Sequence, residues 1–283
     1  MSVLSTRPDA AVTADRRPLV ALAAALLAGV VVAIAGAAAG PTAPASAAVT
    51  ELDYAAVGDS YAAGTGARPY LDSTCYRSSK SYPKLLDLDA NRRLVSFPAC
   101  SGASTVETVS QVATIPTTTK VVTVTVGGND VGFSKVMQNC FVLPRSTCKA
   151  TIDAGTAVAN SQAFKDKLAS VLTAVRNRTE PDATVIVAGY PQLFHLTNGV
   201  NRKYAWADEV NAQTVVLNNV IKTVVVANGA KFVDVQTAFA GHGIGSVAPW
   251  INDWNWLRTV DGFHPNATGY VAYANAIRAV PVA

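Results

Sequence analysis

A serine follows a short apolar run near residue 60, at a point where the chain is expected to turn. Leu52 to Val57 has the composition of a buried strand, and it is followed by Gly58-Asp59-Ser60. A serine on a tight turn at the carboxyl end of a strand is well placed to be a nucleophile, and its backbone N–H can face a developing oxyanion. Gly-Asp-Ser is also an ordinary turn tripeptide. Its interpretation therefore depends on whether the chain supplies the other parts of a catalytic site.

A catalytic serine needs a base, and the chain contains three histidines. His195 lies in an apolar stretch and is expected to pack, and His242 lies between two glycines and is expected to be a loop residue. His264 differs from both because Asp261 precedes it by three residues. A carboxylate at this spacing could accept a hydrogen bond from Nδ1–H and leave Nε2 to take the serine proton.

Two further strand ends offer hydrogen-bond donors. The predicted strand 120–126 is followed by Gly127-Gly128-Asn129-Asp130, in which Asn129 supplies a side-chain amide. The predicted strand 93–97 is followed by a turn that contains Gly102, which supplies a backbone N–H. Together with the N–H of Ser60, these groups would form an oxyanion hole with three donors.

The rest of the chain alternates predicted strands with predicted helices. Expected strands cover residues 52–57, 93–97, 120–126, 184–188 and 231–235, and expected helices cover about 81–88, 151–178, 206–228 and 265–279. This alternation is typical of an open, mostly parallel sheet with helices on both faces, whose sites lie beyond the carboxyl ends of the strands. The polar clusters at 58–60, 101–102 and 129 all fall at such ends, so we expect them to meet at one edge.

Four short motifs now occur in a fixed order along the chain. Gly58-Asp59-Ser60, Gly102, Gly127-Gly128-Asn129-Asp130 and Asp261-x-x-His264 resemble the four sequence blocks of the SGNH hydrolases, also called GDSL lipases and esterases. The secreted actinobacterial branch is the most similar, and the resemblance covers essentially all of residues 48–283. It implies a flavodoxin-like, three-layer α/β/α fold with a five-stranded parallel sheet. It also implies hydrolysis of carboxylic esters through an acyl-serine intermediate.

The resemblance assigns a role to each block residue by its position. Ser60 would be the nucleophile, His264 the base and Asp261 the residue that orients it, in a Ser-His-Asp triad. Ser60, Gly102 and Asn129 would supply the oxyanion hole.

Two points of the family pattern concern acidic residues. Asp59 and Asp130 occupy block positions that we interpret as structural. Some relatives orient the histidine with a backbone carbonyl instead of an acid, so a carbonyl near Trp254, or Asp253, remains an alternative to Asp261.

The segment 249–256 holds three of the four tryptophans. It is either a packed loop or an apolar wall for an acyl chain, with Tyr190, Leu193 and Phe194 as the facing wall. No amphipathic lid helix is evident. The motifs favour a lipase or esterase acting on acylglycerols and simple esters. They leave open a phospholipase, a carbohydrate or polyester esterase, and a non-catalytic lipid- or glycan-binding protein on the same fold.

The N-terminal segment has the layout of a secretory signal peptide. Arg16-Arg17 precedes an apolar run from Leu19 to Ala39, and Ala45-Ser46-Ala47 follows it. We therefore expect residues 1–47 to be removed and residues 48–283 to form the secreted, extracellular hydrolase domain. The apolar run is long enough to span a bilayer, so a retained anchor is the alternative.

All four cysteines lie in the part of the chain expected to be exported, where an even count favours disulfides. Four cysteines allow three pairings. Pairing neighbours in sequence gives Cys75 with Cys100 and Cys140 with Cys148.

The composition limits the partners that we expect. A formal net charge of +4 is too small to argue for a nucleic-acid partner. The chain has no Cys-x-x-Cys pair and no His-rich cluster, so no metal or other cofactor is expected. The expected partner is a small-molecule or lipid ester, met by a monomer that makes at most a transient contact with a lipid surface.

Overall fold

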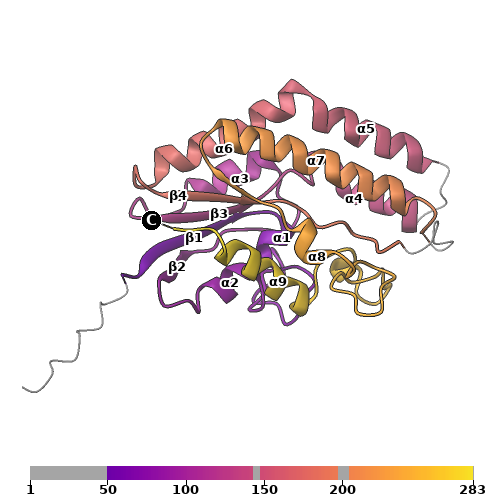
Figure 1. The fold of residues 1–283 in the computed structure, drawn as a ribbon, viewed down its shortest axis with the longest axis horizontal. Coiled ribbons are helices and arrows are strands. Elements are labelled where there is room, and N and C mark those ends of the chain that lie inside the picture. Colours follow the sequence, from indigo (N-terminus) through magenta and orange to yellow (C-terminus); the bar gives the residue numbers. More distant parts are fainter. Residues whose placement is uncertain (1–49, 143–146, 197–203, 283) are drawn as a thin grey trace, which may run out of the picture. The chain divides into compact units, whose positions relative to one another are not determined.

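Five parallel strands form the centre of the computed structural model (Figure 1). The model describes residues 50–142, 147–196 and 204–282, which belong to one compact unit, Ala48–Ala283. Every strand pairing is parallel, and the order is β2-β1-β3-β4-β5, as in flavodoxin-like folds. The predicted α/β fold with a five-stranded parallel sheet is confirmed. The strands are β1 (Leu52–Gly58), β2 (Arg92–Ser96), β3 (Val121–Thr125), β4 (Thr184–Ala188) and β5 (Lys231–Val233).

The central strands are buried along their whole length because helices cover both faces of the sheet. Every residue of β3 and β4 is buried, as expected for parallel strands that never face water. The few hydroxyl groups inside find partners, since Thr123 bonds Tyr54 at 2.7 Å and Thr125 bonds Tyr82 at 3.0 Å. The core is therefore apolar without leaving these polar atoms unpaired.

Two layers of helices enclose the sheet (Figure 1). One layer contains α3 (Thr105–Val112), α5 (Cys148–Asn160), α6 (Gln162–Arg178) and α7 (Ala207–Ala227). The other contains α1 (Ser60–Ala63), α2 (Tyr82–Leu86), α8 (Gln236–Phe239) and α9 (Ala267–Arg278). Helix α4 (Phe133–Met137) and the π-helix η1 (Gln138–Val142) follow β3, and the 3₁₀ turn η4 (Thr259–Asp261) precedes α9.

The short elements α4, η1, α8 and η4 were not predicted, and the longer helices differ from the sequence prediction in two further places. The single helix expected over 151–178 is two helices, because the chain is extended at Ser161, whose side chain then caps α6 by accepting from the N–H of Phe164. Helix α3 was not predicted. Its signal was the capping box that Ser104 and Glu107 form at its start.

Two disulfides are present, Cys75–Cys100 and Cys140–Cys148, and none of the described cysteines is free. The first bridge joins the loop after α1 to the loop after β2. The N–H of Ser101 also donates to the carbonyl of Cys75 at 3.0 Å. The loop that contains Gly102 is therefore held by a disulfide and by a backbone hydrogen bond. The predicted signal peptide, residues 1–47, lies outside the described residues.

Candidate active site

The turn that carries Ser60 is fixed by hydrogen bonds to two neighbouring elements. The side-chain amide of Gln111 accepts from Gly58 N–H at 2.7 Å and donates to Gly58 C=O at 3.0 Å. The N–H of Asp59 donates to the carbonyl of Thr125 at 2.9 Å. Gly58 has a φ of 126°, and a Cβ there would lie 2.1 Å from the Thr125 oxygen. Only glycine fits this turn, and Ser60 consequently begins α1 directly after β1.

The side chain of Asp59 joins this turn to the glycine loop after β3. One carboxylate oxygen accepts from Tyr61 N–H at 2.9 Å, and the other accepts from Tyr190 OH at 2.5 Å. The same Tyr190 oxygen accepts from Gly128 N–H at 3.0 Å. Burial raises the pKa of Asp59 to about 7, although the hydrogen bonds from Tyr190 and Tyr61 oppose this shift. Asp59 thus has contacts of the structural kind that we expected of it.

His264 lies directly beside the serine. Its Nε2 is 2.8 Å from Ser60 Oγ, and its Nδ1 is 2.8 Å from the carbonyl oxygen of Gly262. A carbonyl oxygen only accepts hydrogen bonds, so Nδ1 carries the proton of the neutral ring and Nε2 accepts from the Ser60 hydroxyl. Burial lowers the pKa of His264 to about 4, against the opposing influence of the Gly262 carbonyl and Asp261. The ring is therefore neutral at pH 7, which is the form that can take a proton.

Asp261 does not form the hydrogen bond to His264 that the sequence led us to expect. Its carboxylate accepts instead from Arg68 Nε at 2.7 Å and from Tyr70 OH at 2.5 Å. Asp253, the second acid considered, accepts from Tyr204 OH and from the N–H of Trp254. The partner of Nδ1 is the Gly262 carbonyl, so a triad with direct acid contact is corrected to a serine–histidine pair.

The turn before His264 explains why the carboxylate points away. The N–H of His264 bonds the Asp261 carbonyl at 3.3 Å, and Gly262 has φ −57° and ψ 140°, as in a type II turn. Phe263 occupies the third position of this turn with a φ of 61°. This conformation is unfavourable for a residue with a Cβ. The turn directs the imidazole back over the Gly262 carbonyl, while the Asp261 side chain faces the loop 68–70.

Packing holds Phe263 in this conformation. Its side chain is 2% exposed and stacks on Trp254 at 6.0 Å between ring centroids. Its carbonyl accepts a hydrogen bond from Tyr61 OH at 2.8 Å. The turn that carries His264 is thereby tied to α1, the helix that begins with Ser60.

The loops that carry the other predicted site residues meet the Ser60 turn. The N–H of Cys100 donates to the Gly58 carbonyl at 3.0 Å, and Asn129 Nδ2 donates to the Ala103 carbonyl at 2.9 Å. Asn129 retains one amide hydrogen. No hydrogen-bond acceptor for the N–H of Ser60 or of Gly102 occurs in the described part of the chain. Three N–H groups are thus left unused at the ends of three neighbouring strands.

Asp130 closes the same edge of the sheet. Its carboxylate accepts from the backbone N–H of Thr105 at 3.0 Å and from the Thr105 hydroxyl at 2.6 Å. It therefore binds the start of α3 to the loop after β3. This contact is of the structural kind that we expected of Asp130.

A groove of about 410 Å³ opens beside His264. Trp254 lines it, as one of the two interpretations of the tryptophan segment proposed. The expected facing wall is wrong, because Tyr190, Leu193 and Phe194 are buried at 6%, 1% and 4% exposure and do not line this groove. The facing residues come from α4 and η1 instead. The apolar lining residues include Phe133, Met137, Val142, Trp254, Val260 and Phe263.

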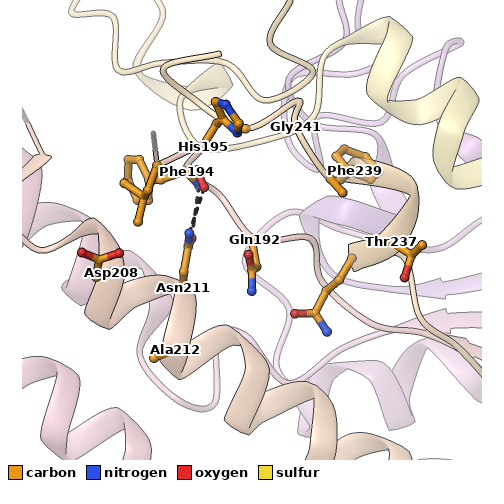
Figure 2. A pocket seen from close by; sticks show the side chains of 13 residues that line it. Gln192, Phe194, His195, Asp208, Asn211, Ala212, Thr237, Phe239 and Gly241 are labelled. Carbon is orange, nitrogen blue, oxygen red and sulfur yellow. Dashed lines mark hydrogen bonds between the residues drawn. The ribbon is translucent and has the colours of Figure 1, made fainter. Parts of the chain in front are cut away.

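The other two histidines take no part in this arrangement. His195 lines a separate cavity of about 640 Å³, whose lining includes none of the predicted catalytic or oxyanion-hole residues (Figure 2). Beside it, the amide of Asn211 donates to the Phe194 carbonyl at 2.8 Å. His242 stacks on Trp250 at 3.6 Å between ring centroids. Both are therefore loop or packing residues.

Among residues 50–142, 147–196 and 204–282, no cluster of three or more His, Cys, Asp or Glu side chains could hold a metal ion. The polar groups of the site are instead those of acid–base and nucleophilic chemistry.

A family model for the GDSL-like lipases and acylhydrolases matches residues 56–272. The chain belongs to this family. It is 37% identical over 256 residues to a lipase of Streptomyces rimosus, covering 88% of this chain and 92% of that one. It is 35% identical over 220 residues to Lipase 1 of Streptomyces coelicolor, covering 76% of this chain and 81% of that one. The chain is accordingly an ester hydrolase of the GDSL type.

Two solved structures of the same family are similar to this one. The crystal structure of the extracellular lipase of S. rimosus matches with a TM-score of 0.76 and 34% identity, over 81% of this chain and 100% of that one. The crystal structure of phospholipase A1 from Streptomyces albidoflavus matches with a TM-score of 0.76 and 32% identity, over 81% of this chain and 99% of that one.

Proposed function

We propose that this chain is a secreted lipase or esterase that cleaves carboxylic esters through an acyl-serine, with Ser60 and His264 as its catalytic pair. The observation that carries the proposal is the continuous path from Ser60 Oγ through His264 to the Gly262 carbonyl, with both contacts at 2.8 Å. Only one tautomer of the neutral ring satisfies both contacts. It is the tautomer that accepts the serine proton.

The reaction then follows from the positions of the protons. His264 Nε2 takes the hydroxyl proton as Ser60 Oγ attacks the ester carbonyl carbon, and the imidazolium that forms keeps its Nδ1–H bonded to Gly262. Nε2 returns its proton to the departing alkoxide, and an acyl-serine remains. A water molecule that gives its proton to Nε2 attacks the acyl carbon. The carboxylic acid leaves, and Ser60 recovers its proton.

The negative charge that develops on the carbonyl oxygen needs donors that are already in place. The proposed donors are the N–H groups of Ser60 and Gly102 and the remaining amide hydrogen of Asn129. Support comes from their lack of other partners among the described residues and from the hydrogen bonds that join their loops.

Asp261 acts on His264 from a distance in this proposal. Its charge favours the imidazolium and so raises the pKa of the ring, while its hydrogen bonds hold the loop 68–70 against the His264 turn. We therefore propose that Asp261 positions the base and stabilises its charged form, without touching it.

The substrate class rests on the groove and the relatives. A groove of about 410 Å³ lined mainly by apolar side chains suits the acyl chain of a lipid ester. The relatives include proteins named as lipases and one named as a phospholipase A1. We therefore propose acylglycerols as substrates, and phospholipids as the second candidate.

Secretion is part of the proposal. It is supported by the signal-peptide pattern of residues 1–47, by two disulfides, and by a relative described as an extracellular lipase. The N-terminal residue of the protein recovered from culture medium, determined by mass spectrometry, is expected to be Ala48.

The catalytic assignment is tested by covalent labelling. A fluorophosphonate probe should label the wild-type protein on Ser60 and leave Ser60→Ala unlabelled. A panel of esters with short, medium and long acyl chains on glycerol and phosphoglycerol head groups would then rank the substrates. Labelling of Ser60→Ala at the wild-type rate would refute the assignment of the nucleophile.

A further inference from the structure

Two large apolar side chains are exposed to solvent in the loop between α8 and α9. They lie in the turn formed by residues 255–258, which we call the tip. Trp256 is 70% exposed, and its neighbour Leu257 is 93% exposed. The loop lies on the side of the sheet where the strands end, beyond α1 (Figure 1). Single exposed apolar residues need no explanation, but adjacent ones beside a binding groove mark an interaction site.

The tip is a structured turn that keeps these side chains outside. The side chain of Asn255 accepts from Leu257 N–H at 2.8 Å, and its carbonyl accepts from Arg258 N–H at 3.0 Å. The carbonyl of Arg258 in turn accepts from Asp261 N–H at 3.0 Å. These bonds order the tip in the free protein. Binding through the tip would therefore cost little conformational entropy.

The tip is continuous with the wall of the groove. Trp254, Thr259 and Val260 line the groove and flank the exposed pair on both sides in sequence. The ring of Trp256 also packs edge-on against Trp254, with 5.3 Å between centroids. A surface that binds the tip would therefore lie beside the opening of the groove.

Near the groove, two exposed side chains without an ion pair are both positively charged. Arg258 and Lys135 are exposed, and neither forms an ion pair within the described residues. Lys135 follows Ser134, which lines the groove. Of the nearby carboxylates, Asp261 is charge-paired with Arg68, and Asp253 accepts hydrogen bonds from Tyr204 and from Trp254 N–H. The rim therefore favours an anionic surface.

We propose that this tip is the docking surface of the protein for anionic lipid bilayers. Trp256 and Leu257 enter the boundary between headgroups and acyl chains, where an indole ring is favoured and an aliphatic side chain is removed from water. Arg258 and Lys135 meet the anionic headgroups, and the groove then faces the lipid layer. This inference rests on the proposed function in that the docked lipids contain the esters to be cleaved.

Binding to vesicles tests the proposal in the Ser60→Ala background, in which the lipids stay intact. The probe is a sucrose-loaded vesicle of phosphatidylcholine, with or without phosphatidylglycerol, and the protein is the form recovered from culture medium. Replacing both apolar residues, as Trp256→Ser with Leu257→Ser, should weaken partitioning by about tenfold or more. Leu88→Ser, which changes a leucine 79% exposed elsewhere, should leave it unchanged.

The electrostatic part has its own control. Arg258→Gln should weaken binding to vesicles that contain phosphatidylglycerol by about fivefold and leave binding to pure phosphatidylcholine unchanged. Lys222→Gln, an exposed lysine on α7, should change neither. Equal partitioning of the Trp256/Leu257 double variant and Leu88→Ser would overturn the proposal. A double variant that instead loses self-association in sedimentation would assign the tip to a second copy of this chain, and would also overturn it.

Hydrolysis separates this proposal from the proposed function. With Ser60 restored, the ratio of vesicle hydrolysis to hydrolysis of a soluble short-chain ester should fall about tenfold or more in Leu257→Ser combined with Trp256→Ser. A wild-type protein that binds vesicles through the tip but cleaves no ester would refute the proposed function and leave the docking surface intact. A ratio unchanged by the double variant would refute the docking surface alone.

Discussion

The two residues of the proposed catalytic pair are held in different ways. The turn of Ser60 is bonded to the interior, through the amide of Gln111, the carbonyl of Thr125 and the buried hydroxyl of Tyr190. The turn of His264 has one such bond, from Tyr61 of α1, and is otherwise bonded to surface loops. Asp261, which precedes this turn, is paired with Arg68, whose side chain is 49% exposed.

This difference separates folding from catalysis. The contacts of the serine turn belong to the sheet and α3, so the fold itself places the nucleophile. The contacts of the histidine turn lie mostly between loops, so the base can be displaced while the sheet stays folded. We therefore expect changes on the serine side to lower stability and activity together, and changes on the histidine side to lower activity with little loss of stability.

The largest effect is expected from the pair itself. Ser60→Ala and His264→Ala should each lower kcat by about 10⁵–10⁶-fold, and the double variant should be little worse than either, because the two residues act as one unit. Turnover of a soluble ester measures the loss, and thermal unfolding checks that the fold persists. Multiplicative losses in the double variant would show that the two residues act independently.

The next effect concerns the oxyanion. Asn129→Ala should lower kcat by about 10²–10³-fold with KM nearly unchanged, because the amide is proposed to bond the oxygen only once it is charged. Asn160→Ala, at the exposed end of α5, serves as the control and should match the wild type. A raised KM with unchanged kcat would make Asn129 a substrate-binding residue instead.

The sequence allowed prediction of those site residues that act through their side chains. Ser60 and Asn129 were recognised by residue type and by their place after strands, and the strands by their apolar runs. His264 was recognised by its spacing from Asp261. The partner of His264 Nδ1 was assigned to Asp261 instead of Gly262, because a backbone carbonyl such as that of Gly262 leaves no trace in residue type. It depends on a type II turn with a non-glycine residue at positive φ, which the packing of Phe263 imposes.

The supports of the serine turn were missed for a related reason. Gln111 lies 53 residues from Gly58 in sequence, and the two meet only once α3 packs on the sheet. The capping box of α3 could have revealed the helix but not this contact. Tyr190 was expected to line the groove, whereas its hydroxyl bridges Asp59 and Gly128 inside the protein.

A smaller effect should show the stability cost on the serine side. Tyr190→Phe leaves the buried Gly128 N–H and one Asp59 oxygen without their partner, which should cost about 2 kcal/mol and lower Tm by about 4–8 °C. Tyr70→Phe removes the hydroxyl on the histidine side, where the ring is partly exposed, and should lower Tm less. Equal shifts of Tm, measured by calorimetry, would contradict the difference between the two halves.

The smallest loss of turnover is expected from Asp261→Asn. A contact acid that fixes the tautomer is worth about 10⁴-fold in kcat, but here Gly262 fixes the tautomer and Asp261 contributes through its charge and the loop contacts. We therefore expect a loss of about tenfold or less. Asp72→Asn is the matched control, because Asp72 also pairs with an arginine, Arg77, and makes no contact with His264.

The pH profile distinguishes the charge of Asp261 from its loop contacts. Wild-type kcat/KM should rise as His264 loses its proton, near the pKa of about 4 that burial imposes, and should be flat well before pH 7. The negative charge of Asp261 raises this pKa, so Asp261→Asn should lower it and move the acid limb to lower pH. Asp72→Asn should leave the limb in place.

A limb near the ordinary histidine pKa of about 6.5 would show that the imidazole is better solvated than the structure indicates. A limb that moves upward in Asp261→Asn would mean that the variant acts by displacing the loop, since loss of a negative charge alone can only lower the pKa of the ring.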